Sequence, residues 1–264
     1  MKIGIFDSGL GGLSVLHCAK KMAPDMQYVY YADEDNVPYG EKTKEQVKEY
    51  TIQAIDYLLE KGVEAVIIAC NTATSSLPME IRRSYPIPIV GMEPALKEAI
   101  RLYGKLGKRI MIAATEVTIR GDKLHHLVDS VDIMHQADMI ALPGLVRFAE
   151  AGSYDGEEVI DYLRDAFSEY DMKEYSTVVL GCTHFNFFKS AFRKAFGEEL
   201  HFVDGNHGTV RQVLRLLGGK PLEEERECVD TEFDIYFSGR EVSNEEREHI
   251  HTCFEQLNKM YKVE

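Results

Sequence analysis

Short apolar runs alternate with longer amphipathic segments over about the first 200 residues of the chain. Residues 43–46, Thr-Lys-Glu-Gln, form a capping box, and apolar residues at helical spacing follow until Gly62. The run at 65–69 is apolar throughout, as in a strand buried on both faces. The runs that predict strands lie at residues 2–6, 27–32, 65–69, 87–92, 109–114 and 177–180. This alternation predicts an α/β fold with mostly parallel strands flanked by helices.

The pattern is repeated once along the chain. "MKIGIFDSG" (residues 1–9) is similar to "KRIMIAATE" (108–116), and "VEAVIIACNTA" (63–73) is similar to "YSTVVLGCTHF" (175–185). Both pairs have nearly the same offset, which predicts two pseudo-symmetric α/β domains with a cleft between them. We place the first domain at residues 1–94 plus 205–264 and the second at residues 95–204.

The pattern changes after residue 204. Residues 208–217 and 244–261 predict helices, residues 233–237 predict a late strand, and residues 223–227 are an acidic stretch. We expect this tail to pack against one of the two domains.

Composition narrows the class of protein. The five cysteines are scattered without a CxxC pair, which favours reduced thiols in the cytoplasm. The net charge of −14 opposes binding to nucleic acid or to an anionic membrane. A carboxylate at Asp7 interrupts the amino-terminal apolar run too early for a signal peptide. We therefore expect a cytoplasmic protein that acts on a small molecule.

Two cysteines stand where chemistry is expected. Cys70 and Cys182 each end an apolar run and begin a polar turn, and ligands bind at such strand ends in α/β folds. Packing explains one buried cysteine, but it does not readily explain two at matching positions. A thiol titrates near ~8.5 and can act as an acid or a base. Two thiols on opposite sides of a substrate could remove a proton from one face and return it to the other.

Other readings of these residues are weaker. A zinc site needs three or four ligands, and Cys70, Cys182 and His184 would form only an unusual one. A Cys–His nucleophile, as in amidases, would use Cys182 with His184 and leave Cys70 without a role. The cluster of Gly9, Gly11 and Gly12 lacks the Lys-Ser/Thr of a phosphate-binding loop, so we assign it to a tight turn. No pyridoxal or metal motif is visible, and we expect no cofactor.

Five motifs, in order, resemble those of the cofactor-independent glutamate racemases of the aspartate/glutamate racemase family. They are "GIFDSGLGGLSV" (4–15), "PYG" (38–40), "ACNTAT" (69–74), "VGMEPA" (90–95) and "LGCTH" (180–184). The chain departs from the family pattern at "ATEVTIRGD" (114–122), at "GLVRFAEAG" (144–152) and at Phe185-Asn186. The resemblance covers about the first 210 residues.

The resemblance implies roles for individual residues. Cys182 takes the α-proton from the L-enantiomer with help from His184, and Cys70 takes it from the D-enantiomer with help from Asp7. Glu150 corresponds to a further assisting glutamate. The implied substrate-binding residues are Ser8, Pro38, Tyr39, Gly40, Asn71, Thr72, Thr115, Thr118 and Thr183.

The implied function is racemisation of glutamate by a homodimer, supplying D-glutamate for peptidoglycan. Two alternatives stay open on the same fold. One is a racemase for aspartate or another small amino acid, because one methylene changes binding by only ~1–3 kcal/mol. The other is a non-catalytic amino-acid-binding regulator, which would need neither sulfur.

Overall fold

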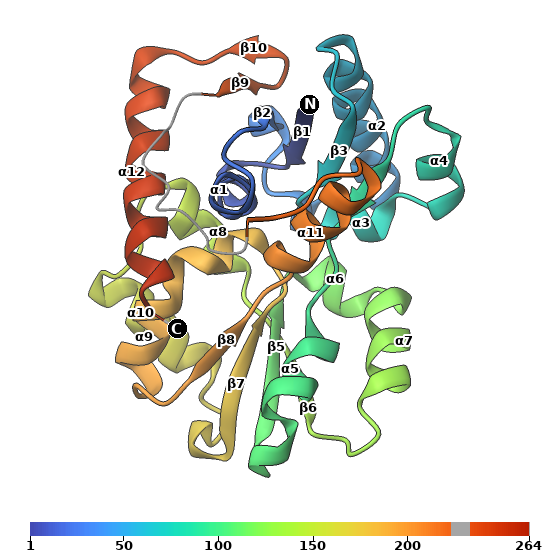
Figure 1. Cartoon of the computed structure of the whole chain (residues 1–264). Helices are drawn as coiled ribbons and strands as arrows, with labels where there is room; N and C mark the ends of the chain where they lie inside the picture. Colours follow the sequence, from blue (N-terminus) through green and yellow to red (C-terminus); the bar gives the residue numbers. More distant parts are fainter. Residues whose placement is uncertain (223–232, 264) are drawn as a thin grey trace.

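Two β-sheets organise the chain, as the computed structural model of residues 1–222 and 233–263 shows (Figure 1). The first sheet has the strand order β10-β9-β2-β1-β3-β4, and all its pairs are parallel except the β9–β10 hairpin. Its strands are β1 (Lys2–Asp7), β2 (Gln27–Ala32), β3 (Ala65–Ile68), β4 (Ile89–Gly91), β9 (Asp234–Phe237) and β10 (Arg240–Glu241). The predicted α/β class is confirmed.

The second sheet is wholly parallel and has the order β6-β5-β7-β8. Its strands are β5 (Arg109–Ala114), β6 (Ala137–Ala141), β7 (Tyr175–Leu180) and β8 (His201–Val203). β1 lies beside β3 as β5 lies beside β7, which is the relation that the internal repeat predicts. The sequence missed β6 and β8, because β6 is only partly buried and β8 has three residues.

Helices cover the sheets, and local sequence sets several of their ends. Thr43 caps α2, and Ser243 caps α12, each through a complete capping box. The α-helices are α1 (Leu13–Met22), α2 (Lys44–Glu60), α3 (Asn71–Ser76), α4 (Met79–Ser84), α5 (Leu96–Tyr103), α6 (Glu116–Arg120), α7 (Asp122–Val131), α8 (Pro143–Glu150), α9 (Glu157–Ala166), α10 (Lys189–Phe196), α11 (Asn206–Leu216) and α12 (Asn244–Tyr261). Short 3-10 turns include η1 (Leu10–Gly12), η3 (Tyr39–Glu41) and η6 (Thr183–Phe188).

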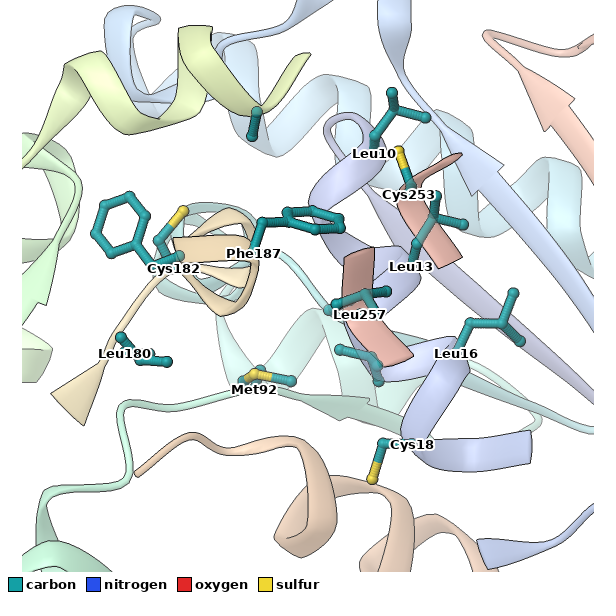
Figure 2. Close-up of a cluster of buried hydrophobic side chains, with 14 of the residues drawn as sticks. Leu10, Leu13, Leu16, Cys18, Met92, Leu180, Cys182, Phe187, Cys253 and Leu257 are labelled. Carbon is teal, nitrogen blue, oxygen red and sulfur yellow. The ribbon is translucent and has the colours of Figure 1, made fainter. Parts of the chain in front are cut away.

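One hydrophobic cluster joins the two sheets. Leu10 and Leu13, next to the first sheet, belong to the same buried cluster as Phe187 of η6 and Leu257 of α12 (Figure 2). The side-chain amide of Gln256 also donates to the Phe187 carbonyl at 2.9 Å. The prediction that the tail packs against one domain is wrong, since β9 extends the first sheet while α12 contacts both α1 and η6. The helix α12 contacts both parts because it buries apolar side chains against α1 on one side and against η6 on the other.

Some features lie outside this description. The acidic stretch at 223–227 and Cys228 fall in residues that the structure does not describe. Within residues 1–222 and 233–263, no helix combines the length and the apolar character needed to cross a bilayer.

The shared cluster gives a test of stability. Phe187 is fully buried and its ring stacks on Tyr154 with centroids 5.1 Å apart. We expect Phe187→Ala to lower the free energy of unfolding by about 3–5 kcal/mol, because it leaves a cavity between η6 and α12. Chemical denaturation measures this, with Leu106→Ala, at a 54% exposed side chain, as the control. Equal losses in the two variants would contradict the packing described above.

Candidate active site

A cavity of about 190 Å³ lies between the two sheets. Drug-sized ligands occupy pockets of roughly 300–1,000 Å³, so this cavity suits a smaller molecule. Cys70, just beyond Ala69 at the end of β3, and Cys182, just beyond Gly181 at the end of β7, both line it. The complete lining is Ser8, Pro38, Tyr39, Gly40, Glu41, Cys70, Asn71, Thr72, Thr115, Glu116, Pro143, Val146, Arg147, Cys182, Thr183 and His184.

The structure therefore brings most of the predicted site residues to one cavity. Three of them, Asp7, Glu150 and Thr118, lie behind the wall and contact residues that line it. The sequence missed five lining residues, which are Glu41, Glu116, Pro143, Val146 and Arg147. Glu41 directly follows the "PYG" motif, and three of the others fall where the chain departs from the family pattern, so no motif marked them.

Cys70 lies in a buried polar environment on the side of the first sheet. Its sulfur accepts a hydrogen bond from the Ala73 N–H at 3.4 Å. Burial, with a smaller contribution from the charge of Asp7, raises the pKa of Cys70, so this group rests as a thiol. Asp7 is itself buried and accepts from the Thr183 hydroxyl at 3.0 Å. Burial raises the pKa of Asp7 to about 6, although His184 and Thr183 oppose the shift.

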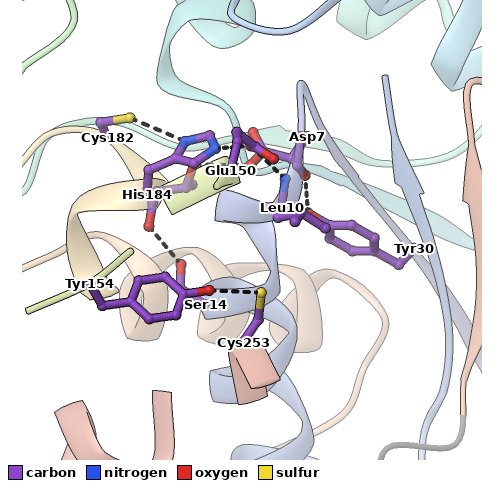
Figure 3. A network of polar contacts seen from close by, with 11 residues as sticks. Asp7, Leu10, Ser14, Tyr30, Glu150, Tyr154, Cys182, His184 and Cys253 are labelled. Atoms are coloured by element: carbon purple, nitrogen blue, oxygen red, sulfur yellow. Dashed lines mark hydrogen bonds and ion pairs between the residues drawn. The ribbon is translucent and has the colours of Figure 1, made fainter. Parts of the chain in front are cut away.

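Cys182 begins a chain of polar contacts on the side of the second sheet (Figure 3). Its sulfur lies 3.6 Å from Nδ1 of His184, and Nε2 of His184 contacts Glu150. Glu150 also accepts from the Leu10 N–H at 3.0 Å. Burial lowers the pKa of His184, but its hydrogen bonds to Cys182 and Glu150 outweigh burial and raise it well above the usual value. An imidazolium beside a sulfur stabilises a thiolate.

The glycine cluster allows these groups to approach the backbone. A Cβ at Gly9 would lie 2.2 Å from the Glu150 carboxylate, and one at Gly11 would lie 2.5 Å from His184. Gly9 has an extended backbone with φ of −161°, so a left-handed turn is not the reason for glycine there. The chain does turn tightly after β1, through η1, and the close approach to the site is a further reason why glycine is needed there.

Asp33 supports the site and was missed by the sequence analysis. The Tyr39 hydroxyl donates to the Asp33 carboxylate at 2.6 Å. The same carboxylate accepts from Asn36 and, at 3.0 Å, from the hydroxyl of Ser238 beyond β9. These bonds fix the Tyr39 ring against the cavity. The sequence did contain a sign of this role, because Asp33 directly follows the apolar run at 27–32. Cys70 was recognised by the same feature, since it directly follows the apolar run at 65–69.

Glu34 is an unexpected carboxyl group close to Glu150. Both side chains, together with Leu10, line a second hollow next to the site. The Oε1 atom of Glu34 is buried and has no hydrogen-bond partner among the described residues. Burial, and then the charge of Glu150, raises the pKa of Glu34 to about 9. Glu34 is therefore protonated at neutral pH and adds no charge beside the Glu150–His184 pair.

This arrangement predicts a pH-dependent effect of Glu34→Gln. Between the ordinary pKa of 4.5 and about 9, the folded protein keeps a proton on Glu34 that the unfolded chain releases. Glu34 therefore lowers stability increasingly as the pH rises through this window, and it has no such effect below 4.5. Glutamine resembles the protonated form, so the variant should gain about 1–3 kcal/mol at pH 7.5 and almost nothing at pH 4.5.

Urea unfolding at the two pH values measures the gain, with exposed Glu199→Gln as the control. A gain that is the same at both pH values would contradict the assigned protonation.

The site can move protons at a small substrate. Two sulfurs from different sheets line one cavity, and hydroxyl, amide and carboxylate groups surround them. Among residues 1–222 and 233–263, no three His, Cys, Asp or Glu side chains are placed to hold a metal ion.

Comparisons with known proteins place the chain among amino-acid racemases. The family model for Asp/Glu/Hydantoin racemase matches residues 13–213. A glutamate racemase of Lachnospira eligens is 44% identical over the whole of both chains, and glutamate racemase 2 of Bacillus subtilis is 46% identical over 83% of each. The structure of Escherichia coli glutamate racemase with L-glutamate and the activator UDP-MurNAc-Ala superposes with a TM-score of 0.80 and 26% identity, covering 97% of this chain and 94% of that one. The chain therefore belongs to the Asp/Glu/Hydantoin racemase family.

Proposed function

We propose that the protein is a glutamate racemase, an isomerase that interconverts L- and D-glutamate at the α-carbon without a cofactor. The observation that carries this proposal is the presence of Cys70 and Cys182 on the wall of one cavity, each from the end of a corresponding strand. The relatives from Lachnospira eligens and Bacillus subtilis are named glutamate racemases and match the chain over most or all of its length.

The two thiols have unlike surroundings, which supports different roles for them. Beside the His184 imidazolium, Cys182 acts as a thiolate and takes the α-proton of L-glutamate. Cys70, which rests as a thiol, gives its proton to the opposite face of the carbanion. The products are D-glutamate, a Cys182 thiol and a Cys70 thiolate, and the reverse reaction restores the starting pair. Asp7 and His184 assist their respective thiols, and Glu150 holds His184.

Polar groups on the wall support binding and charge stabilisation. Both side-chain polar atoms of Asn71 are buried and lack a hydrogen-bond partner among the described residues, so they are free to bind the substrate. Thr72 and Thr183 lie beside the two cysteines, and their hydroxyls can bind the α-carboxylate by leaving their present partners, Thr115 and Asp7. Ser8, Pro38, Tyr39 and Gly40 line the same cavity.

Two threonines connect the walls of the cavity. The Thr72 and Thr115 hydroxyls lie 2.9 Å apart, and the Thr115 hydroxyl donates to Thr118 at 3.0 Å. We assign Thr115 to substrate contact and Thr118 to the positioning of Thr115.

We keep the division into residues 1–94 plus 205–264 and residues 95–204 as a proposal. It is supported by the sheets, since β1–β4 with β9 and β10 fall in the first part and β5–β8 in the second. Hinge motion between these parts would admit the substrate. We also propose, from the family, a cytoplasmic homodimer that supplies D-glutamate for peptidoglycan.

Replacing either thiol should separate proton exchange from racemisation. We expect Cys70→Ser and Cys182→Ser each to lower racemisation of glutamate by about 10²–10⁴-fold, because one acid–base group is lost. In D₂O, Cys70→Ser should still exchange the α-proton of L-glutamate, and Cys182→Ser that of D-glutamate. Circular dichroism follows racemisation, and NMR follows the exchange.

The control is Cys18→Ser, a buried cysteine of α1 that does not line the cavity. Near-normal turnover in either site variant would contradict the two-thiol mechanism. Wild-type exchange with aspartate but not with glutamate would favour the aspartate alternative, and binding without exchange would favour the regulator. Ammonia release that is indifferent to Cys70 would indicate an amidase.

A further inference from the structure

Arg147 has an unusual place among the residues that line the cavity. Of the lining residues that the structure describes, it is the only lysine or arginine. Its guanidinium pairs with Glu41 of η3, so the contact joins α8 to the segment after β2 across the cavity. The two side chains are 69% and 49% exposed, which places the pair at the outer edge of the cavity.

The charges of the lining leave a dicarboxylic substrate one carboxylate without a partner. Glu41 and Glu116 already supply two carboxylates to the wall. The other group that carries positive charge, His184, is 2% exposed and is held between Cys182 and Glu150 at the inner end. Among the described lining residues, Arg147 is therefore the positively charged group that can pair with a second carboxylate of the substrate.

Exchange of partners by Arg147 requires little free energy. An exposed ion pair contributes little to stability, so the Glu41–Arg147 contact is readily broken. A carboxylate that enters the cavity can accept two parallel hydrogen bonds from a guanidinium, away from bulk water, and this contact is stronger. Arg147 would thus gain by leaving Glu41 for the substrate.

We propose that Arg147 determines substrate specificity by leaving Glu41 to bind the side-chain carboxylate of a dicarboxylic amino acid. This inference rests on the proposed racemisation and names the residue that selects its substrate class. Arg147 and Glu150 lie one turn apart on α8. The same helix therefore sets both the side-chain anchor and the support of His184, which fixes the distance between the anchored carboxylate and the reacting carbon.

Arg147→Met tests the proposal because methionine keeps much of the length and removes the charge. In D₂O, we compare α-proton exchange of L-glutamate with that of L-glutamine, whose amide replaces the side-chain carboxylate. The variant should lose about 10- to 100-fold in kcat/KM for glutamate, mainly through KM, and change little with glutamine. Arg147→Lys should keep part of the preference, and Arg101→Met, from an exposed Arg–Glu pair, is the matched control.

Glu41→Gln separates substrate binding from closure of the cavity. If Arg147 binds the substrate, loss of its competing partner leaves the KM for glutamate unchanged or lower. If the Glu41–Arg147 pair only holds the cavity closed, Glu41→Gln harms both substrates as much as Arg147→Met does, and the proposal is overturned. Equal losses with glutamate and glutamine in Arg147→Met also overturn it. Absence of glutamate exchange in the wild type would instead refute the proposed function and this inference together.

Discussion

The close contact between the glycine turn after β1 and the turn after β7 is the constraint on which the site depends. A side chain at Gly11 would collide with both His184 and Thr183, so the two segments can meet only because glycine stands there. This contact brings Asp7 to the Thr183 hydroxyl and Leu10 to the Glu150 carboxylate. Groups from both sheets therefore share one buried network (Figure 3).

The two sides of the junction differ in the strength of their contacts. On one side, α1, η6 and α12 share a continuous apolar core, which resists separation because opening it would expose buried surface. On the other side, the Thr72–Thr115 hydrogen bond and the exposed Glu41–Arg147 pair span the cavity. Breaking these polar contacts would expose little apolar surface, which agrees with the proposed hinge opening at this side.

The surroundings of the two thiols differ in burial and charge. Cys70 lies near the charge of Asp7, which disfavours a second negative charge, whereas Cys182 lies against a cationic His184. Glu34 stays protonated and so leaves this balance undisturbed. A pseudo-symmetric fold thus holds a site that is asymmetric in charge, as proton transfer between two like groups requires.

The sequence alone determined the α/β class, most strands of the first sheet, strands β5 and β7 of the second, and the two cysteines that follow corresponding strands. These features are local, because strand burial, helix caps and strand-end turns leave patterns within a few neighbouring residues. Only the tertiary structure decided the positions of Asp33, Glu34, Glu41 and Arg147, and the need for glycine at Gly9 and Gly11. Each of these depends on contacts between segments distant along the chain, and such contacts leave no periodic pattern in the sequence.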